Sequence, residues 1–294
     1  KTVGVLPPHH TFGSSVMMVG HAMIGCEIYI SAGIRYVQKE LKEQKPEHIV
    51  LVPLYLETFY RKIWANVREQ GKEELVKKLI KVSNGLLKVG IDVRKKIFAS
   101  IRAAFGGEVK MMISGGAPIN PEILSFFEAI GISTLNGYGI TECAPIISVN
   151  HTKRNIKGSI GIPLDIDTVK IDQPNEDGEG EILVRGSNVM LGYYKDEQAT
   201  AEAFDEEGYF LTGDLAKIDA ESGHYMIVGR IKNMIVIGNG KKVFPEEIEE
   251  YLEPIDIISE CVVVGRKAED GETVELTAIV YPKPEIYGET PDKE

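Results

Sequence analysis

The first 150 residues alternate between short apolar runs and helix-like patterns, which leaves few folds open to the chain. An alternation of this kind is typical of a mostly parallel sheet with helices on its faces. We therefore expect an α/β subdomain over residues 1–156. Its predicted strands span residues 3–6, 27–30, 48–53, 109–114 and 133–136.

The pattern changes beyond this region. Short strands with turn signals, such as the acidic, Gly-containing stretch 175–180, predict a small antiparallel sheet or distorted barrel over residues 157–231. Residues 232–294 follow a strand-helix-strand pattern, with Pro245 at the start of the helix. We interpret them as the beginning of an α+β C-terminal domain.

A long helical stretch over about residues 54–107 interrupts the α/β pattern and is predicted to break near Gly71 and Gly85. Its Lys and Arg residues lie beside apolar residues at helical spacing, which indicates amphipathic helices with solvated basic faces. Peripheral contact with a membrane is the alternative interpretation of this basic surface.

Charge and cysteine content exclude several classes of protein. The net charge is −11 and the pI is about 5.2, whereas a nucleic-acid surface needs a clustered basic excess. The three cysteines, Cys26, Cys143 and Cys261, show no paired spacing that suggests a disulfide framework or a zinc site. We expect core or incidental cysteines, a reducing compartment and a cytoplasmic protein. The most apolar run, residues 15–34, contains charged residues and three glycines, so no transmembrane helix is predicted.

The segment Asn136-Gly137-Tyr138-Gly139-Ile140-Thr141-Glu142 combines the groups that a nucleotide site needs. It supplies an aromatic ring to stack on a base, glycines that let the backbone approach phosphate, a hydroxyl, and a carboxylate suited to Mg²⁺. The alternative is a Gly-rich turn in which Tyr138 fills the core and Glu142 is merely solvated.

Further motifs occur in a fixed order around this segment. With them the chain resembles the adenylate-forming superfamily of acyl-CoA synthetases, luciferases and peptide-synthetase adenylation domains. The resemblance runs nearly from end to end. Its motifs are Leu6-Pro7-Pro8-His9-His10-Thr11-Phe12-Gly13, Ser114-Gly115-Gly116-Ala117-Pro118, Gly180-Glu181-Ile182, Gly192-Tyr193, Tyr209-Phe210-Leu211-Thr212-Gly213-Asp214-Leu215, Gly229-Arg230-Ile231-Lys232-Asn233 and Pro245-Glu246-Glu247-Ile248-Glu249.

The resemblance implies a role for each motif. Tyr138 would stack on adenine, Asn136 would hydrogen-bond its exocyclic amine, Thr141 would contact the α-phosphate, and Glu142 would bind Mg²⁺. The adenine pocket would also include Gly115, Gly116, Ala117, Gly137 and Gly139. Local turn hydrogen bonds are the alternative role for Thr141 and Glu142.

Four more residues take roles from the resemblance. Asp214 would accept the ribose hydroxyls, Arg230 would donate to ribose or phosphate, Lys232 would be the hinge of the C-terminal lid, and His10 would lie near the bound carboxylate. The alternatives are a turn cap for Asp214, a surface salt bridge for Arg230, an exposed lysine for Lys232 and a structural histidine for His10.

The resemblance implies an enzyme that uses ATP, Mg²⁺ and CoA to convert a carboxylic acid into acyl-AMP and then acyl-CoA. The helical stretch 54–107 is typical of long-chain fatty acid members. The superfamily's phosphate loop and lid lysine match nothing in residues 1–294, so we expect a fragment that does not turn over alone. Activation of another acid, transfer to a carrier protein, and a non-catalytic nucleotide- or acyl-binding module are the alternatives.

Overall fold

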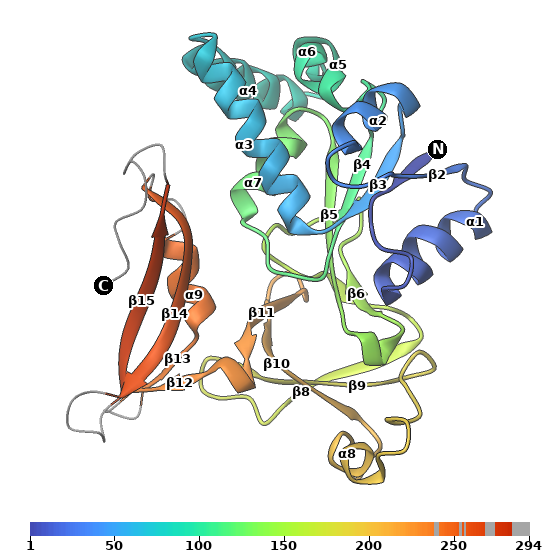
Figure 1. The fold of residues 1–294 in the computed structure, drawn as a ribbon, viewed down its shortest axis with the longest axis vertical. Helices are drawn as coiled ribbons and strands as arrows, with labels where there is room; N and C mark the ends of the chain where they lie inside the picture. The colour runs from blue at the N-terminus through green and yellow to red at the C-terminus, as the bar shows by residue number, and fades with distance from the viewer. Residues whose placement is uncertain (238–240, 253–254, 256, 268–273, 284–294) are drawn as a thin grey trace. The chain divides into compact units, whose positions relative to one another are not determined.

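The structure is a computed structural model that describes residues 1–237, 241–252, 255, 257–267 and 274–283 (Figure 1). The chain forms two compact units. Unit 1 comprises residues 1–169, 184–210 and 219–225, and unit 2 comprises residues 170–183, 211–218 and 226–294. The predicted division into three subdomains stays a prediction.

Unit 1 is built on a seven-stranded sheet with the order β2-β1-β3-β4-β5-β6-β7. The first five of these strands are parallel, and β6 and β7 continue the sheet in antiparallel pairs. All five strands predicted from the sequence are present, and the α/β fold class is confirmed. The strands are β1 (Thr2–Gly4), β2 (Ile28–Ile30), β3 (His48–Leu51), β4 (Met111–Ser114), β5 (Ser133–Gly139), β6 (Ile146–Val149) and β7 (Ile162–Pro163).

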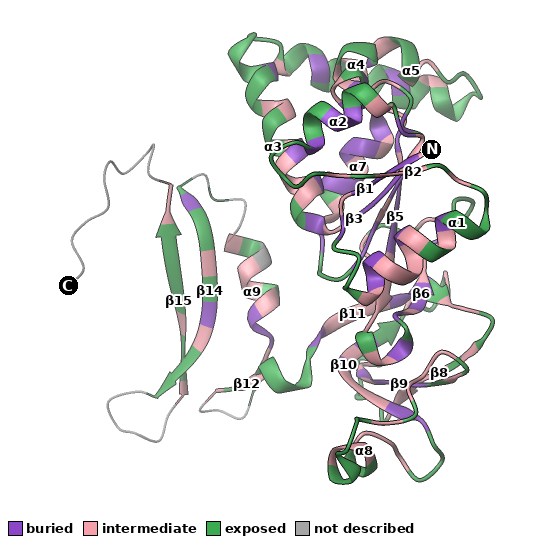
Figure 2. Cartoon of the chain, turned by 45° about the vertical axis from the view of Figure 1, so that its right-hand side comes forward, coloured by how far each residue is buried: buried purple, intermediate pink, exposed green. Residues whose placement is uncertain are grey.

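Alternate side chains of the parallel strands enter two apolar clusters. On β3, Ile49 and Leu51 belong to the larger cluster, whereas Val50 belongs to a smaller one that includes Phe12 and Met17. Successive residues of a strand point to opposite faces, so helices cover both faces of this sheet. The central strands β1 and β3 are accordingly buried, while the outer surfaces of the helices are exposed (Figure 2).

The smaller cluster is covered by a π-helix, η1 (Phe12–Gly20), which continues into α1 (His21–Met23). The larger cluster takes apolar residues from α2, α3 and α7 and from the segment around α5 and α6. The helices are α2 (Val37–Gln44), α3 (Pro53–Glu69), α4 (Glu73–Lys88), α5 (Arg94–Ile97), α6 (Ala99–Arg102), η2 (Ala103–Phe105) and α7 (Pro121–Ala129).

The helical stretch predicted over 54–107 consists of α3, α4, α5, α6 and η2. The break predicted at Gly71 lies between α3 and α4, and Gly71 has a φ of 64° there. The break predicted at Gly85 is wrong, because α4 continues through this residue to Lys88. A single glycine costs an interior helical position only about 1 kcal/mol, which its neighbours can offset. No described helix is both long and apolar enough to span a membrane.

A four-stranded sheet has the order β11-β10-β9-β8, in which each strand lies beside its neighbour in sequence. In unit 2, β12 and β13 pair antiparallel, as do β14 and β15, and α9 packs against β14. The remaining elements are η3 (Thr141–Cys143), β8 (Asp167–Asp172), β9 (Gly180–Gly186), α8 (Glu197–Glu202), β10 (Phe210–Ile218), β11 (Tyr225–Arg230), η4 (Ile231–Asn233), β12 (Ile235–Val236), β13 (Lys242–Val243), α9 (Pro245–Leu252), β14 (Ile258–Lys267) and β15 (Val274–Pro282).

Candidate nucleotide site

Two of the predicted motifs meet at the carboxyl ends of neighbouring parallel strands. Ser114 on β4 is the register partner of Asn136 on β5, so the glycines that follow each residue are adjacent. A Cβ on Gly115 would lie 3.3 Å from the carbonyl oxygen of Gly137. Gly116 has a φ of 90°, which residues with a side chain rarely adopt. Ligands of open α/β sheets bind at this edge, where exposed backbone can approach phosphate.

The loop that carries His10 reaches the same turn. A Cβ on Gly115 would also lie 3.3 Å from the Cζ atom of Phe12. The Phe12 backbone amide donates to Nδ1 of His10 over 3.2 Å, and the His10 amide donates to the carbonyl of Pro7 over 3.1 Å. His10 is exposed and its ring is held by its own loop. Its role beside a carboxylic acid stays a prediction.

Close backbone packing shapes the Tyr138 segment. Tyr138 and Gly139 end β5, where Gly139 pairs with Ile146 of β6. A Cβ on Gly139 would overlap the carbonyl group of Pro145, so this position accepts only glycine without movement of the backbone. Tyr138 is half-buried, and its stacking on adenine stays a prediction.

Glu142 lies in the short helix η3 and is fixed at two points. Its carbonyl accepts the backbone N–H of Met190 over 2.7 Å, and its Oε1 atom accepts the hydroxyl of Tyr193 over 3.0 Å. Burial and the hydrogen bond to this carboxylate raise the pKa of Tyr193. The phenol therefore stays a donor at neutral pH.

The neighbour of Glu142 is a fully buried cysteine, Cys143. Burial, together with the charges of Asp167 and Glu142, raises the pKa of its thiol to about 12. A thiol in this state is neither a nucleophile nor a metal ligand at neutral pH. Cys143 is thus part of the core beneath the site.

The half-buried carboxylate of Glu142 fits Mg²⁺. Mg²⁺ prefers oxygen ligands and is commonly bound through one or two carboxylates together with the phosphates of a substrate. Glu142 supplies a carboxylate oriented by Tyr193, next to glycine-rich backbone at the strand ends.

Asn136 belongs to a buried polar network. Its Nδ2 donates to the carbonyl of Ser159 over 3.2 Å, and Nδ2 of Asn150 donates to the same carbonyl over 2.9 Å. The hydroxyl of Ser159 donates to Oδ1 of Asn150 over 3.1 Å. Oδ1 of Asn136 is buried without a partner among the described residues. It is the acceptor that the predicted bond to an adenine amine requires, and that bond stays a prediction.

In unit 2, Asp214 and Arg230 form an ion pair, which is the alternative role predicted from the sequence for Arg230. Nε of Arg230 donates to Oδ1 of Asp214 over 2.7 Å, and the side chains are 58% and 5% exposed, respectively. Asp214 follows Gly213, which has a φ of 71° and whose N–H donates to Glu181. A Cβ on Gly229 would collide with the ring of Phe244, so the residue before Arg230 must be small.

Lys232 lies on η4 and is exposed. The adjacent Asn233 is anchored, because its Nδ2 donates to Oε1 of Glu246 on α9 over 2.5 Å. The hinge role of Lys232 stays a prediction.

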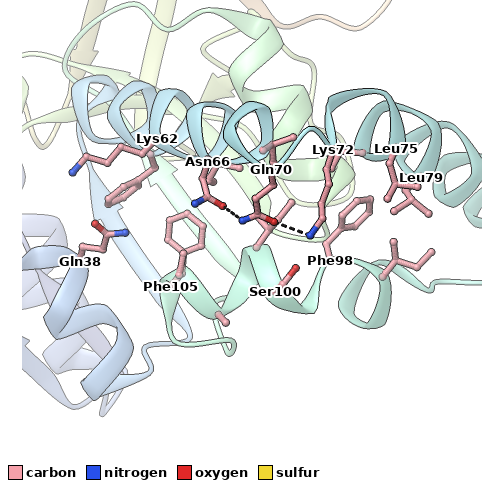
Figure 3. Close-up of a pocket in the computed structure, with 18 of the residues that line it drawn as sticks. Gln38, Lys62, Asn66, Gln70, Lys72, Leu75, Leu79, Phe98, Ser100 and Phe105 are labelled. Atoms are coloured by element: carbon pink, nitrogen blue, oxygen red, sulfur yellow. Dashed lines mark hydrogen bonds between the residues drawn. The ribbon is translucent and has the colours of Figure 1, made fainter.

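A separate cavity of about 650 Å³ lies in the helical stretch of unit 1 (Figure 3). Phe59, Phe98 and Phe105 give it an apolar wall, and Lys42 and Lys62 also line it. Nζ of Lys72 donates to Gln70, whose amide donates to Asn66, each over 2.7 Å, along one side of this cavity.

Sequence reasoning did not identify several side chains that hold the site together. They are Phe12, Asn150, Ser159 and the hydroxyl of Tyr193 as the partner of Glu142. Phe12 and Tyr193 were part of quoted motifs, but 51 residues separate Tyr193 from Glu142. No local pattern reports a contact of that range.

Comparison with known proteins identifies the family. Residues 1–194 match the family described as AMP-binding enzyme, and the chain belongs to this family. It is 31% identical over 293 residues to long-chain-fatty-acid–CoA ligase 6 of Rattus norvegicus, covering 96% of this chain and 41% of that protein. The chain thus spans less than half the length of the curated relatives it matches.

Solved structures agree on the fold. The ATP-bound structure of MatB from Rhodopseudomonas palustris is 23% identical, with a TM-score of 0.72 over 99% of this chain and 51% of that chain. The o-succinylbenzoate coenzyme A synthetase of Bacillus subtilis, in complex with ATP and magnesium ion, is 21% identical, with a TM-score of 0.69 over 95% of this chain and 51% of that chain.

Proposed function

We propose that the protein is an AMP-forming long-chain fatty acid:CoA ligase. The observation that carries this proposal is the paired end of β4 and β5, where two glycine turns lie against each other. Glu142 follows the second turn and is oriented by Tyr193. Membership of the AMP-binding family and similarity to long-chain-fatty-acid–CoA ligases support it.

In the proposed first step, an oxygen of the fatty acid carboxylate attacks the α-phosphorus of ATP and pyrophosphate leaves, which gives acyl-AMP. The enzyme must orient the acid and shield the phosphate charge. Tyr138 stacks on the adenine, with Gly115, Gly116 and Ala117 on its other side, and Asn136 bonds the exocyclic amine. Thr141 contacts the α-phosphate. Mg²⁺, when bound through Glu142, neutralises phosphate charge.

Asp214 and Arg230 complete the nucleotide contacts in the proposal. The carboxylate of Asp214 accepts the ribose hydroxyls, while Arg230 fixes that carboxylate and donates to ribose or phosphate. Their hydrogen bond of 2.7 Å supports a carboxylate held in one orientation.

In the proposed second step, the sulfur of CoA attacks the acyl carbonyl of acyl-AMP, a thioester forms and AMP leaves. Lys232 is the hinge at which the C-terminal domain changes position between the two steps. His10 lies beside the acyl carboxylate. CoA is the proposed acceptor, and a carrier protein is the competing one.

We further propose a cytoplasmic enzyme that contacts membranes peripherally. The helices of the stretch 53–105 support this, because exposed lysines accompany exposed apolar residues such as Leu75 and Val82. Long-chain acids reside in membranes, so a basic helical surface would bring the enzyme to its substrate.

The test is acid-dependent release of pyrophosphate by the product of the complete gene, with acids from acetate to long-chain fatty acids, with and without CoA. We expect release to peak at long chains and acyl-CoA to form only when CoA is present. Release with aryl or short-chain acids would show that these acids, and not long-chain fatty acids, are the substrates. Release without any CoA-dependent product would favour a carrier protein, and no release with any acid would overturn the ligase.

A further inference from the structure

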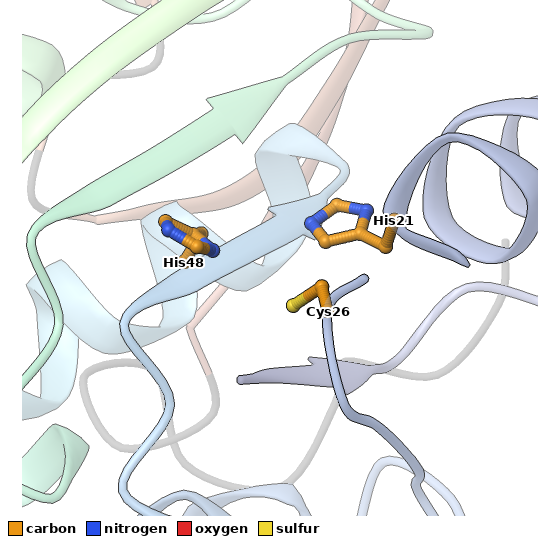
Figure 4. A group of neighbouring side chains, drawn as sticks. All are labelled: His21, Cys26 and His48. Atoms are coloured by element: carbon orange, nitrogen blue, oxygen red, sulfur yellow. The ribbon is translucent and has the colours of Figure 1, made fainter. Parts of the chain in front are cut away.

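Three potential metal ligands meet at the end of the parallel sheet opposite the candidate nucleotide site. His21, Cys26 and His48 each offer one ligand atom, and these atoms all lie within 4.8 Å of one another (Figure 4). The residues come from α1, from the loop before β2 and from the first position of β3. The nucleotide motifs follow the last residues of β4 and β5, whereas this cluster lies where the parallel strands begin.

The backbone around the cluster is tightly fixed. The N–H of Cys26 donates to the carbonyl of His21 over 2.9 Å, which closes the turn between them. The N–H of Thr2 on β1 donates to the carbonyl of Glu27 over 2.9 Å, and the Thr2 hydroxyl donates to the carbonyl of His48 over 2.9 Å. β1 therefore holds the segments that carry Cys26 and His48, and the turn joins His21 to Cys26.

A hydrogen bond sets the tautomer of His21 that can bind a cation through Nε2. Nδ1 of His21 lies 3.0 Å from the carbonyl of Val16, and only a protonated Nδ1 can donate to that oxygen. The lone pair is then on Nε2. A histidine that binds a metal typically donates its other ring N–H to a backbone carbonyl in this way. His21 is 6% exposed, so its ring has one orientation.

His48 adds a second, independent observation. Its Nδ1 is buried and has no hydrogen-bond partner among the described residues. An unpartnered buried ring nitrogen is unfavourable, and ordered structures normally satisfy such a group. No described group near His48 serves as the partner of this nitrogen. A bound cation, or a molecule bound to that cation, would supply the partner.

We propose that His21, Cys26 and His48 form a zinc site. Zn²⁺ prefers imidazole nitrogen and thiolate sulfur at about 2.0–2.3 Å in tetrahedral geometry, which places neighbouring ligands about 3.3–3.8 Å apart. The present spacing is up to 4.8 Å, so binding requires rotation of the side chains of Cys26 and His48, which are less buried than His21. Water fills the fourth position, and the thiol proton of Cys26 is released to solvent on binding. The site joins α1, the start of β2 and β3, and its role is to stabilise this edge of the sheet.

The first test uses the 294-residue chain without an affinity tag, stripped with a chelator and titrated with Zn²⁺ alone. We expect one zinc per chain by elemental analysis after gel filtration, a rise in Tm, and a thiolate-to-metal absorption band when Co²⁺ replaces Zn²⁺. Cys26→Ser and His48→Gln should each weaken binding at least tenfold and remove the rise in Tm. Cys261→Ser, which changes another partly exposed cysteine, should behave as the wild type.

A second measurement needs no variant. Zinc should protect Cys26 from alkylation, as seen by mass spectrometry of its peptide, and should leave Cys261 reactive. Equal alkylation of Cys26 with and without zinc would overturn the proposal, as would equal zinc binding by the wild type and Cys26→Ser. ATP binding should be the same in the stripped and loaded chains, so the result is independent of the ligase proposal.

Discussion

Replacement of Asp214 by asparagine separates the ribose role from a structural one. The Asp214 carboxylate is 5% exposed and is bonded to Arg230, whose side chain is 58% exposed. Asp214→Asn keeps the shape but removes the charge. Arg230 can then be hydrated again, so the loss of stability should be near the lower value for a charged hydrogen bond, about 1.5 kcal/mol. Removal of one partner of a fully buried ion pair costs about 3–5 kcal/mol, because the other charge stays buried without a partner. That cost does not apply here, because the Arg230 side chain is 58% exposed.

The effect on nucleotide binding should equal or exceed this loss of stability. An asparagine at position 214 cannot accept two ribose hydroxyls as a carboxylate does, and each charge-assisted bond contributes about 1.5–3 kcal/mol. ATP affinity should therefore fall about 10- to 100-fold. Isothermal titration calorimetry of the chain with ATP and Mg²⁺ measures the affinity, and urea denaturation measures the stability.

Asp92→Asn is the matched control for Asp214→Asn. Asp92 also binds an arginine, Arg94, over 2.7 Å, but its side chain is 50% exposed and it lies in the helical stretch. Its loss should cost at most about 1 kcal/mol and leave ATP affinity unchanged. Equal ATP affinity of Asp214→Asn and the wild type, or an equal loss in both variants, would refute the ribose assignment.

Two further predictions concern backbone strain and acid stability. Gly116→Ala and Gly107→Ala should each lower stability by about 1–2 kcal/mol, because both glycines have a positive φ, 90° and 82°, in otherwise open space. Only Gly116→Ala should weaken ATP binding in calorimetry, and equal ATP binding by the two variants would remove Gly116 from the site. Arg94 holds the pKa of Asp92 at about 2, below its usual 3.8, so this pair stabilises the fold fully above pH of about 4 and loses its effect as the pH falls toward 2. Urea denaturation across this window should show a smaller acid loss in Asp92→Asn, and parallel curves would contradict the assignment.

Elements with a local cause could be predicted from the sequence. The five parallel strands were predicted because each is a short apolar run, and the break predicted near Gly71 lies where this glycine has a φ of 64°. Gly85 carries the same local signal, yet α4 continues through it. Local propensity does not report the packing that decides such a position.

The candidate site was predictable only in part. The resemblance gave Asp214 and Arg230 contacts to the same nucleotide, which stay predictions, and the structure shows Nε of Arg230 2.7 Å from Oδ1 of Asp214. The sequence did not predict long-range contacts such as the hydrogen bond between Tyr193 and Glu142. Cysteine spacing gave no sign of a zinc site, because one histidine of the proposed ligand set joins the others only through the order β2-β1-β3.

The most direct test of the account is the Mg²⁺ dependence of ATP binding in the Glu142→Gln variant. Glu122→Gln is its control, because Glu122 also accepts a tyrosine hydroxyl, that of Tyr60 over 3.2 Å, on the exposed surface of α7. Calorimetry with Mg²⁺ and with a chelator should show Mg²⁺-enhanced ATP affinity in the wild type and in Glu122→Gln, and none in Glu142→Gln. Enhancement that survives in Glu142→Gln, or its absence from the wild type, would contradict the proposed nucleotide site.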